Sequence, residues 1–196
     1  DYDNLYVMRD VDWQDKTVGE LAVESGKHPV DLMIELCLTN NDQIFVQPIV
    51  NESREDLKTL LGHEQILATF SDSGAHVAQE MGSSLQTHFL HYWVNQAKAF
   101  TLEAAVKKLS HDNARAFGLG QRGMLKEGYW ADILLFEEDR IRPCVPVVEN
   151  DLPGGARRLV QKAEGIRRVF VNGAESFIDG ESTGQYAGGL LSSQSK

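Results

Sequence analysis

An apolar run that ends in an acidic turn most constrains how this chain can fold. Residues 66–70 have the length of a buried strand and lead directly into Ser71-Asp72-Ser73-Gly74, with His76 just beyond. Gly74 permits a sharp backbone turn after the strand. Because parallel α/β folds gather their catalytic side chains at the carboxyl ends of strands, Asp72 is a candidate functional carboxylate. The alternative is an Asx-turn that only ends the strand.

The residues before this run predict a βαβ unit. Residues 43–50 are typical of a strand, and Ser53 is a helix cap followed by acids in the first turn, where the helix dipole favours them. With the run at 66–70, the order is strand, helix, strand, which predicts parallel pairing through a right-handed crossover. Such a unit cannot bury both faces of its strands alone, so it requires more sheet than this chain contains.

Helix caps and apolar spacing predict five further helices around this unit. Thr17 and Glu20 form a capping box, and Gly26 ends the helix that they begin. Pro29 fits the first turn of the next helix, in which Val30 and Cys37 are among the residues expected to face inward. The predicted helices cover residues 17–25, 29–38, 84–98 and 101–109, with a short one over 110–118. His88 and His91 lie on the third of these and are interpreted as packing or surface residues rather than metal ligands.

The pattern changes after residue 118, where glycines and short strands replace helices. Residues 131–136 and 167–171 are predicted strands, and Asn172-Gly173 is a strong hairpin signal before a returning strand at 175–178. Residues 137–160 contain three prolines and are predicted to be a loop. We therefore expect a helical βα part over 1–118, a small β part over 119–184, and a flexible Gly/Ser-rich tail over 185–196.

Composition excludes several classes of function. The net charge of -10, with Lys and Arg dispersed, argues against nucleic-acid binding. No apolar run approaches the roughly 20 residues that span a bilayer, so no membrane partner is expected. Cys37 and Cys144 form no CxxC motif and are interpreted as free thiols in a reducing compartment, which favours a cytoplasmic location.

Three segments resemble one family of hydrolases. They are residues 70–77 (FSDSGAHV); residues 113–119 with 122–136 (NARAFGL, RGMLKEGYWADILLF); and residues 151–158 with 165–166 and 169–173 (DLPGGARR, GI, VFVNG). The second segment resembles the region where the barrel of the amidohydrolase superfamily leads into a small β-domain. The first and third resemble the N-acyl-D-amino-acid deacylase (D-aminoacylase) family. The resemblance extends from about residue 13 to residue 184.

This resemblance implies an α/β fold: the last strands and helices of a metal-dependent-hydrolase (β/α)₈ barrel, followed by part of a small β-sandwich domain. It implies hydrolysis of N-acyl-D-amino acids by zinc-activated water, with Asp72 as the catalytic residue that transfers the proton and as a possible metal ligand. Ser71, Ser73, Gly74 and His76 would then form the substrate loop.

The chain also differs from the family pattern. It contains no His-x-His pair, so most metal ligands of the family would have to come from outside it, and the isolated chain is expected to be inactive and to bind no zinc. Residues 79–84 include no arginine for a substrate carboxylate. Two alternatives stay open: a non-catalytic fragment that self-associates, and a hydrolase of cyclic amides such as hydantoins or dihydropyrimidines. Unpaired strand edges predict a homo-oligomer.

Overall fold

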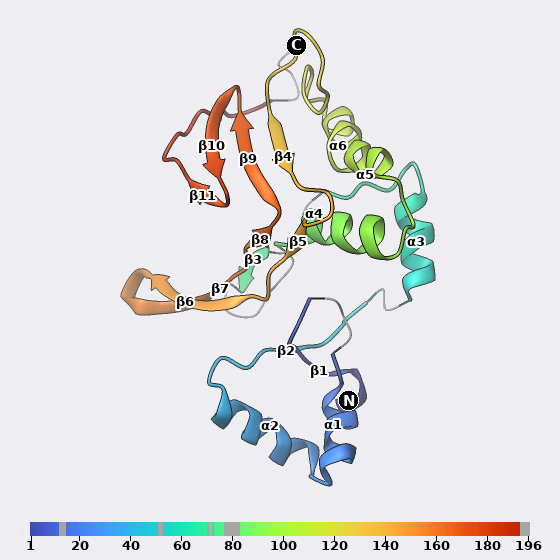
Figure 1. The fold of residues 1–196 in the computed structure, drawn as a ribbon, viewed down its shortest axis with the longest axis vertical. Helices are drawn as coiled ribbons and strands as arrows, with labels where there is room; N and C mark the ends of the chain where they lie inside the picture. Colours follow the sequence, from blue (N-terminus) through green and yellow to red (C-terminus); the bar gives the residue numbers. More distant parts are fainter. Residues whose placement is uncertain (12–14, 51–52, 70, 72, 77–82, 193–196) are drawn as a thin grey trace.

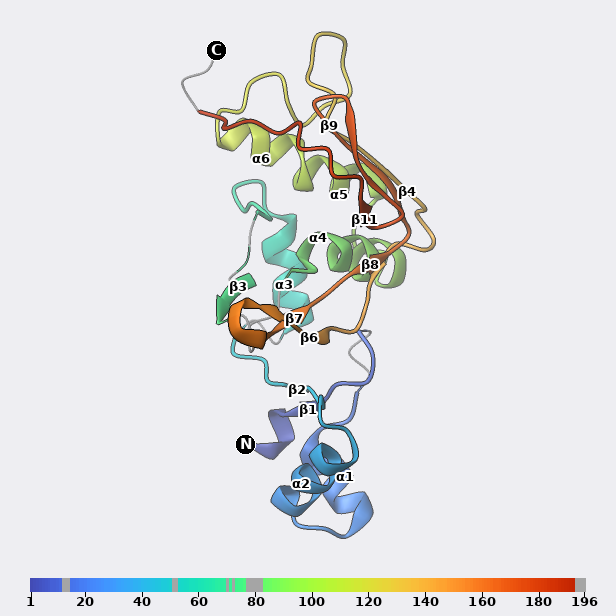
Figure 2. The ribbon, with the colours of Figure 1, turned by 90° about the vertical axis from the view of Figure 1, so that its left-hand side faces the viewer.

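The computed structural model describes residues 1–11, 15–50, 53–69, 71, 73–76 (the backbone alone at 75 and 76) and 83–192. The chain is elongated (Figures 1 and 2). An amino-terminal unit lies at one end of the long axis, helices and a small sheet lie at the other, and the two chain ends are far apart.

The amino-terminal unit is built from two helices and a short two-stranded sheet. Its elements are η1 (Tyr2–Asn4), β1 (Tyr6–Val7), α1 (Val18–Ser25), α2 (Pro29–Thr39) and β2 (Phe45–Val46). The predicted capping box is confirmed, because Thr17 Oγ1 accepts from the Glu20 amide and Glu20 accepts from the Thr17 amide. Gly26 ends α1 in the left-handed conformation, as expected. The unit has its own small core of Val7, Val18, Ala22 and Leu32.

The outer face of α2 differs from the prediction. Leu32 is the residue of this helix that is buried, whereas Val30, Ile34 and Cys37 are exposed. The apolar spacing identified the helix correctly but placed too many of its residues inward, because α2 packs one face, around Leu32, against α1 and the small core of this unit.

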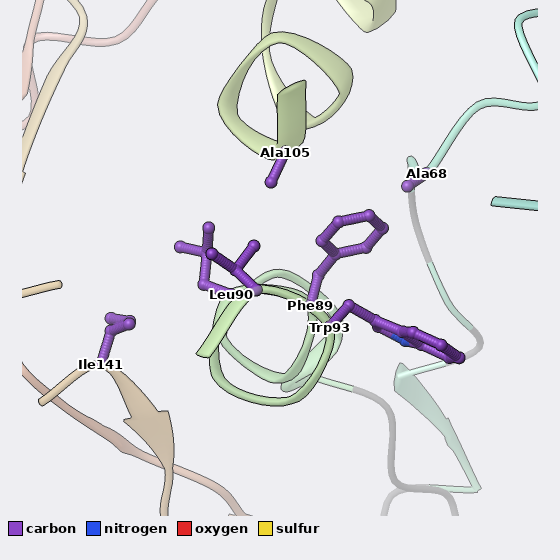
Figure 3. Packing of buried hydrophobic residues seen from close by; sticks show 7 residues of the cluster. Ala68, Phe89, Leu90, Trp93, Ala105 and Ile141 are labelled. Atoms are coloured by element: carbon purple, nitrogen blue, oxygen red, sulfur yellow. The ribbon is translucent and has the colours of Figure 1, made fainter. Parts of the chain in front are cut away.

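The central part consists of helices packed around one aromatic-rich segment. Its elements are α3 (Arg54–Gly62), β3 (Ser73–His76), α4 (Leu85–His88), the π-helical segment η2 (Phe89–Gln96), α5 (Leu102–Leu109) and α6 (His111–Ala116). The predicted caps Ser53 and Thr101 begin α3 and α5. Figure 3 shows Phe89, Leu90 and Trp93 projecting from η2 toward Ala105, Ala68 and Ile141, which form the main core.

The predicted helix over 84–98 changes its hydrogen-bonding period partway along. It begins as α-helix at Leu85 and continues as π-helix from Phe89, and the amide of Ala97 donates to the carbonyl of Tyr92 five residues earlier at 2.7 Å. The wider turn lets Phe89 and Trp93 both contact Phe100, with ring centroids 5.4 and 6.4 Å apart.

The parallel strand pairing predicted for the βαβ unit is wrong. β2 is short and pairs antiparallel with β1, Tyr6 opposite Val46 and Val7 opposite Phe45. Residues 66–69 form no strand, and the next described strand, β3, begins at Ser73. The physical reason is that a parallel strand requires a neighbouring strand, and the described residues supply none beside this segment.

The carboxyl-terminal part is antiparallel throughout the described residues. A four-stranded sheet has the order β11 (Glu181–Ser182), β10 (Ala174–Ile178), β9 (Ile166–Val171), β4 (Ile133–Phe136). The hairpin prediction is confirmed at Asn172 and Gly173, which have φ of +50° and +83° as this type of tight turn requires. Beyond it, the carbonyl of Ala187 accepts a hydrogen bond from Asn172 Nδ2 at 2.6 Å. Ala187 belongs to the tail that the sequence predicts to be flexible, and this bond attaches it to the hairpin turn.

Residues 137–160 are not the predicted loop. β6 (Val147–Leu152) and β7 (Ala156–Val160) form an antiparallel hairpin through the turn η3 (Pro153–Gly155), and β5 (Arg142–Pro143) pairs with β8 (Ala163–Glu164). The hairpin projects from the rest of the molecule (Figure 1). Pro143 ends β5, Pro146 lies between β5 and β6, and Pro153 lies in the turn η3. The prolines therefore leave the paired ladder of β6 and β7 intact.

None of the described helices is both long enough and apolar enough to cross a bilayer.

Candidate functional site

The serine-rich turn that the sequence singled out is a compact local structure. The amide of Ser73 donates to Ser71 Oγ at 3.3 Å. Gly74 has φ of +97°, which glycine adopts readily, but it lies inside β3, so the sharp turn expected there is not seen. Ser71 is half-buried and Ser73 is exposed. Asp72 lies outside the described residues, and His76 is placed only as the last residue of β3.

This turn adjoins a cleft of about 680 Å³ between the amino-terminal unit and the central helices. Ser71 and residues 67–69 form part of one wall, and η2 contributes Phe89 and Trp93. β1 and β2 form the opposite wall, and Pro143 and Gln161 close one side. The volume lies in the range of small-molecule sites, and the lining is mostly apolar.

The acidic side chains of the cleft are engaged in local structure. Asp10 Oδ1 accepts from the Arg142 guanidinium at 2.8 Å and from the Val11 amide at 2.6 Å. Asp15 Oδ2 accepts from the amides of Arg9 and Asp10. The Asp10–Arg142 pair therefore joins the amino-terminal unit to β5, and neither carboxylate is set up as a base.

Histidines and cysteines of the described chain have structural surroundings. His88 stacks on Tyr92 with ring centroids 5.6 Å apart, which agrees with its interpretation as a packing residue. Both cysteines are free, as predicted. Burial raises the pKa of the Cys144 thiol, and the nearby Glu164 carboxylate raises it further, while Arg142 and Lys162 oppose them. Cys144 is therefore protonated at neutral pH and is a poor nucleophile.

The described residues do not assemble a metal centre. Across these residues, no three His, Cys, Asp or Glu side chains lie close enough together to hold an ion. A catalytic zinc site typically needs three protein ligands, so the donor set present here does not fit a zinc ion. No arginine or lysine stands among the described residues that line the cleft.

Sequence reasoning missed two polar residues that contact the backbone leading to the serine turn. Lys108 is buried and donates to the carbonyls of His63 and Ile66, and Asn113 donates to the carbonyl of Ala68. A signal was present for the lysine, because Lys108 lies three residues after the buried Ala105, on the apolar face of α5.

The comparisons with known proteins agree with one another. A model of the amidohydrolase family matches residues 9–176. The chain is 27% identical over 187 residues to a D-aminoacylase of Alcaligenes xylosoxydans xylosoxydans, a match that covers 90% of this chain and 34% of that protein. It is 40% identical over 91 residues to an N-acyl-D-glutamate deacylase of the same organism, covering 46% of this chain and 17% of that protein.

The fold has a relative among solved structures. A D-aminoacylase with a binuclear metal centre superposes with a TM-score of 0.54 at 25% identity, covering 96% of this chain and 37% of that one. The chain thus spans about a third of the length of the D-aminoacylases that it matches. Because the family match extends over most of the sequence and the fold agrees with it, this chain belongs to the amidohydrolase family and is similar to D-aminoacylases over nearly all of its length.

Proposed function

We propose that this chain is the carboxyl-terminal part of a hydrolase that cleaves the N-acyl amide of D-amino acids. The observation that carries the proposal is the similarity to a D-aminoacylase along 90% of the chain. The serine-rich turn at 71–76 lies inside the matched region, and Ser71 lines a cleft of a size suited to a small acylated amino acid.

In this proposal Asp72 is the group that moves the proton. A carboxylate at that position takes a proton from the attacking water and later gives it to the leaving amine nitrogen, so that a neutral amine departs. Ser71, Ser73, Gly74 and His76 form the loop beside the substrate. The hydrogen bond between the Ser73 amide and Ser71 Oγ supports this role, because it fixes Ser71 relative to Ser73.

The metal of this reaction is proposed from the relatives. Zinc, when bound in such sites, acidifies a water molecule and polarises the acyl carbonyl. The described residues do not form a ligand set, so Asp72 would be at most one ligand and the others would have to come from outside them. For this reason the isolated chain is proposed to bind no zinc and to be inactive.

The same similarity supports the proposed architecture. Residues 1–118 would complete a (β/α)₈ barrel with strands supplied from outside the chain, and residues 119–184 would be part of a small β-sandwich. The antiparallel sheet of β4, β9, β10 and β11 supports the second assignment. A cytoplasmic location is inferred only from the two free cysteines.

A second candidate is a non-catalytic chain that folds and self-associates. It is favoured by the lack of a metal-ligand cluster in the described residues, together with the partial match to the length of the relatives.

One experiment separates the two functions. The chain replaces the matched third of the Alcaligenes D-aminoacylase, and the chimera is assayed for zinc content and for hydrolysis of N-acetyl-D-amino acids, with the L-isomers as substrate controls. We expect D-selective turnover that falls at least about 100-fold in Asp72→Asn, the scale of a lost general base, and is unchanged in Asp139→Asn, an exposed acid. A metal-loaded chimera in which Asp72→Asn is as fast as the parent contradicts the proposal.

A further inference from the structure

The backbone that leads into the serine turn is held by side chains instead of by a neighbouring strand. Among the described residues, the carbonyls of His63, Ile66 and Ala68 accept hydrogen bonds from the side chains of Lys108 and Asn113. A fourth, weaker contact follows, from Gln86 Nε2 to the carbonyl of Thr69 at 3.4 Å. Backbone carbonyls are strong hydrogen-bond acceptors, and here side chains from the helices are among their partners.

Lys108 is the unusual member of this set. Only 9% of the residue is exposed, and its ammonium lies 3.2 Å from the His63 carbonyl and 2.6 Å from the Ile66 carbonyl. No carboxylate in the described chain forms an ion pair with it, and burying an ammonium that has only neutral partners is costly. An apolar side chain of similar length would fill the same space without that cost, so the ammonium itself has a role.

The end of α3 explains how the charge is tolerated. His63 is the C-cap of α3, at the end where the helix dipole is negative, and its carbonyl also accepts from the Ile66 amide at 3.2 Å. The Lys108 ammonium donates directly to this end and also to Ile66, which begins the next segment. It therefore joins α3, α5 and the start of that segment at one point.

Asn113 holds the same segment two residues further on. Its Nδ2 donates to the carbonyl of Ala68 at 2.7 Å and to the carbonyl of Leu109 at 3.2 Å. Ala68 is buried in the main core beside Phe89 and Trp93, as Figure 3 shows. A backbone held at residues 63, 66 and 68 by two helices can neither slide along α5 and α6 nor rotate about a single contact.

We propose that Lys108 and Asn113 are positioning residues, which fix the backbone at 63–68 and thereby set where the serine turn emerges at the cleft. The inference rests on the proposed function, because it takes the turn that contains Asp72 as the reacting loop. Ser71 lies three residues beyond the last anchored carbonyl, so a shift of the anchored segment moves the loop with it. Small displacements of reacting groups are enough to slow catalysis by about 100-fold.

Hydrogen exchange of the chain itself tests the anchoring. Amide exchange is measured by mass spectrometry on a peptide covering 63–69 for the variants Lys108→Met and Asn113→Ala. We expect exchange in that peptide to accelerate about tenfold, since local opening becomes easier when these hydrogen bonds are lost. The control Lys107→Met removes a charge from the same helix, but at an exposed site paired with Asp112, and should leave the peptide unchanged.

A second control separates positioning from a general loss of stability. Gly165→Ala lies in the β part, and its Cβ would collide with the backbone around Ile141. It should accelerate exchange throughout the chain without favouring residues 63–69. The anchoring is overturned if Lys108→Met behaves like Lys107→Met, or if it accelerates all peptides equally, as Gly165→Ala does.

Turnover in the chimera completes the test. Lys108→Met is expected to lower kcat about 100-fold and to leave KM nearly unchanged, because the loop is displaced and the cleft wall is not. Gly165→Ala is expected to keep the kcat of the parent at the assay temperature. Unchanged kcat in Lys108→Met overturns the positioning role. Failure of the proposed function looks different: the chimera then hydrolyses nothing, while the exchange difference at 63–69 persists and supports the anchoring.

Discussion

Gly165 marks a close approach of two backbone segments. It has φ of +81°, and a Cβ there would lie 2.6 Å from the backbone nitrogen of Ile141, which is almost fully buried. Its carbonyl also accepts from the Glu137 amide at 2.8 Å. The close approach places β9 beside the segment that leads into β5.

We predict that Gly165→Ala lowers the free energy of unfolding by about 2–4 kcal/mol. About 1–2 kcal/mol comes from the left-handed conformation and the rest from displaced backbone. Gly154→Ala is the matched control, because Gly154 has φ of +75° but nothing within 4 Å of its Cβ, so only the first contribution of about 1–2 kcal/mol applies. Urea denaturation measures both, and equal losses would contradict the packing argument.

At the scale of elements, a bidentate ion pair between Asp151 and Arg158 connects β6 to β7 in the hairpin. Arg158 Nε and Nη2 donate to the two oxygens of Asp151 at 2.7 and 2.6 Å. The hydrogen bond from Arg158 is the main reason that the pKa of Asp151 lies below its ordinary value of 3.8. Because the folded pKa is the lower one, the stabilising contribution is present above about pH 3.8 and is lost as the pH falls through the folded pKa.

We predict that Arg158→Met returns the Asp151 titration toward its ordinary range. The reason is that the methionine removes both donors while keeping an unbranched side chain of similar reach. Carboxyl-carbon NMR measures the titration directly, with Arg157→Met as the control, since Arg157 is exposed and is the neighbour in sequence. The ion-pair assignment fails if both variants titrate alike.

At the scale of the whole molecule, large apolar side chains stay at the surface of the single chain. Leu38 on α2 is 80% exposed, and Ile49, just after β2, is 85% exposed. We therefore propose that the chain self-associates, because large exposed apolar side chains favour association.

Light scattering at micromolar concentration checks this proposal. The expected result is a mass above that of one chain, and Ile49→Asp together with Leu38→Asp should shift it toward the monomer. A monodisperse monomer of the unsubstituted chain contradicts it.

Much of the local structure follows from the sequence alone. Thr17, Gly26, Ser53 and Thr101 begin or end helices where expected, and the Asn172–Gly173 turn forms the predicted hairpin. These features depend on hydrogen bonds and φ values within about four residues, so a short window of sequence contains the whole interaction. The family resemblance, quoted on short motifs, is likewise confirmed by the comparisons.

Pairing and burial were decided by the tertiary structure. Residues 66–69 have the composition of a strand, yet their carbonyls at 66 and 68 bond to Lys108 and Asn113, more than forty residues away. β2 pairs with β1 across nearly forty residues, and β6 and β7 pair despite their neighbouring prolines. A strand pairs only with partners that can be distant in sequence, and a buried lysine is tolerated only where folding brings carbonyl oxygens to it. The composition and spacing of one segment therefore predict neither the pairing nor the burial.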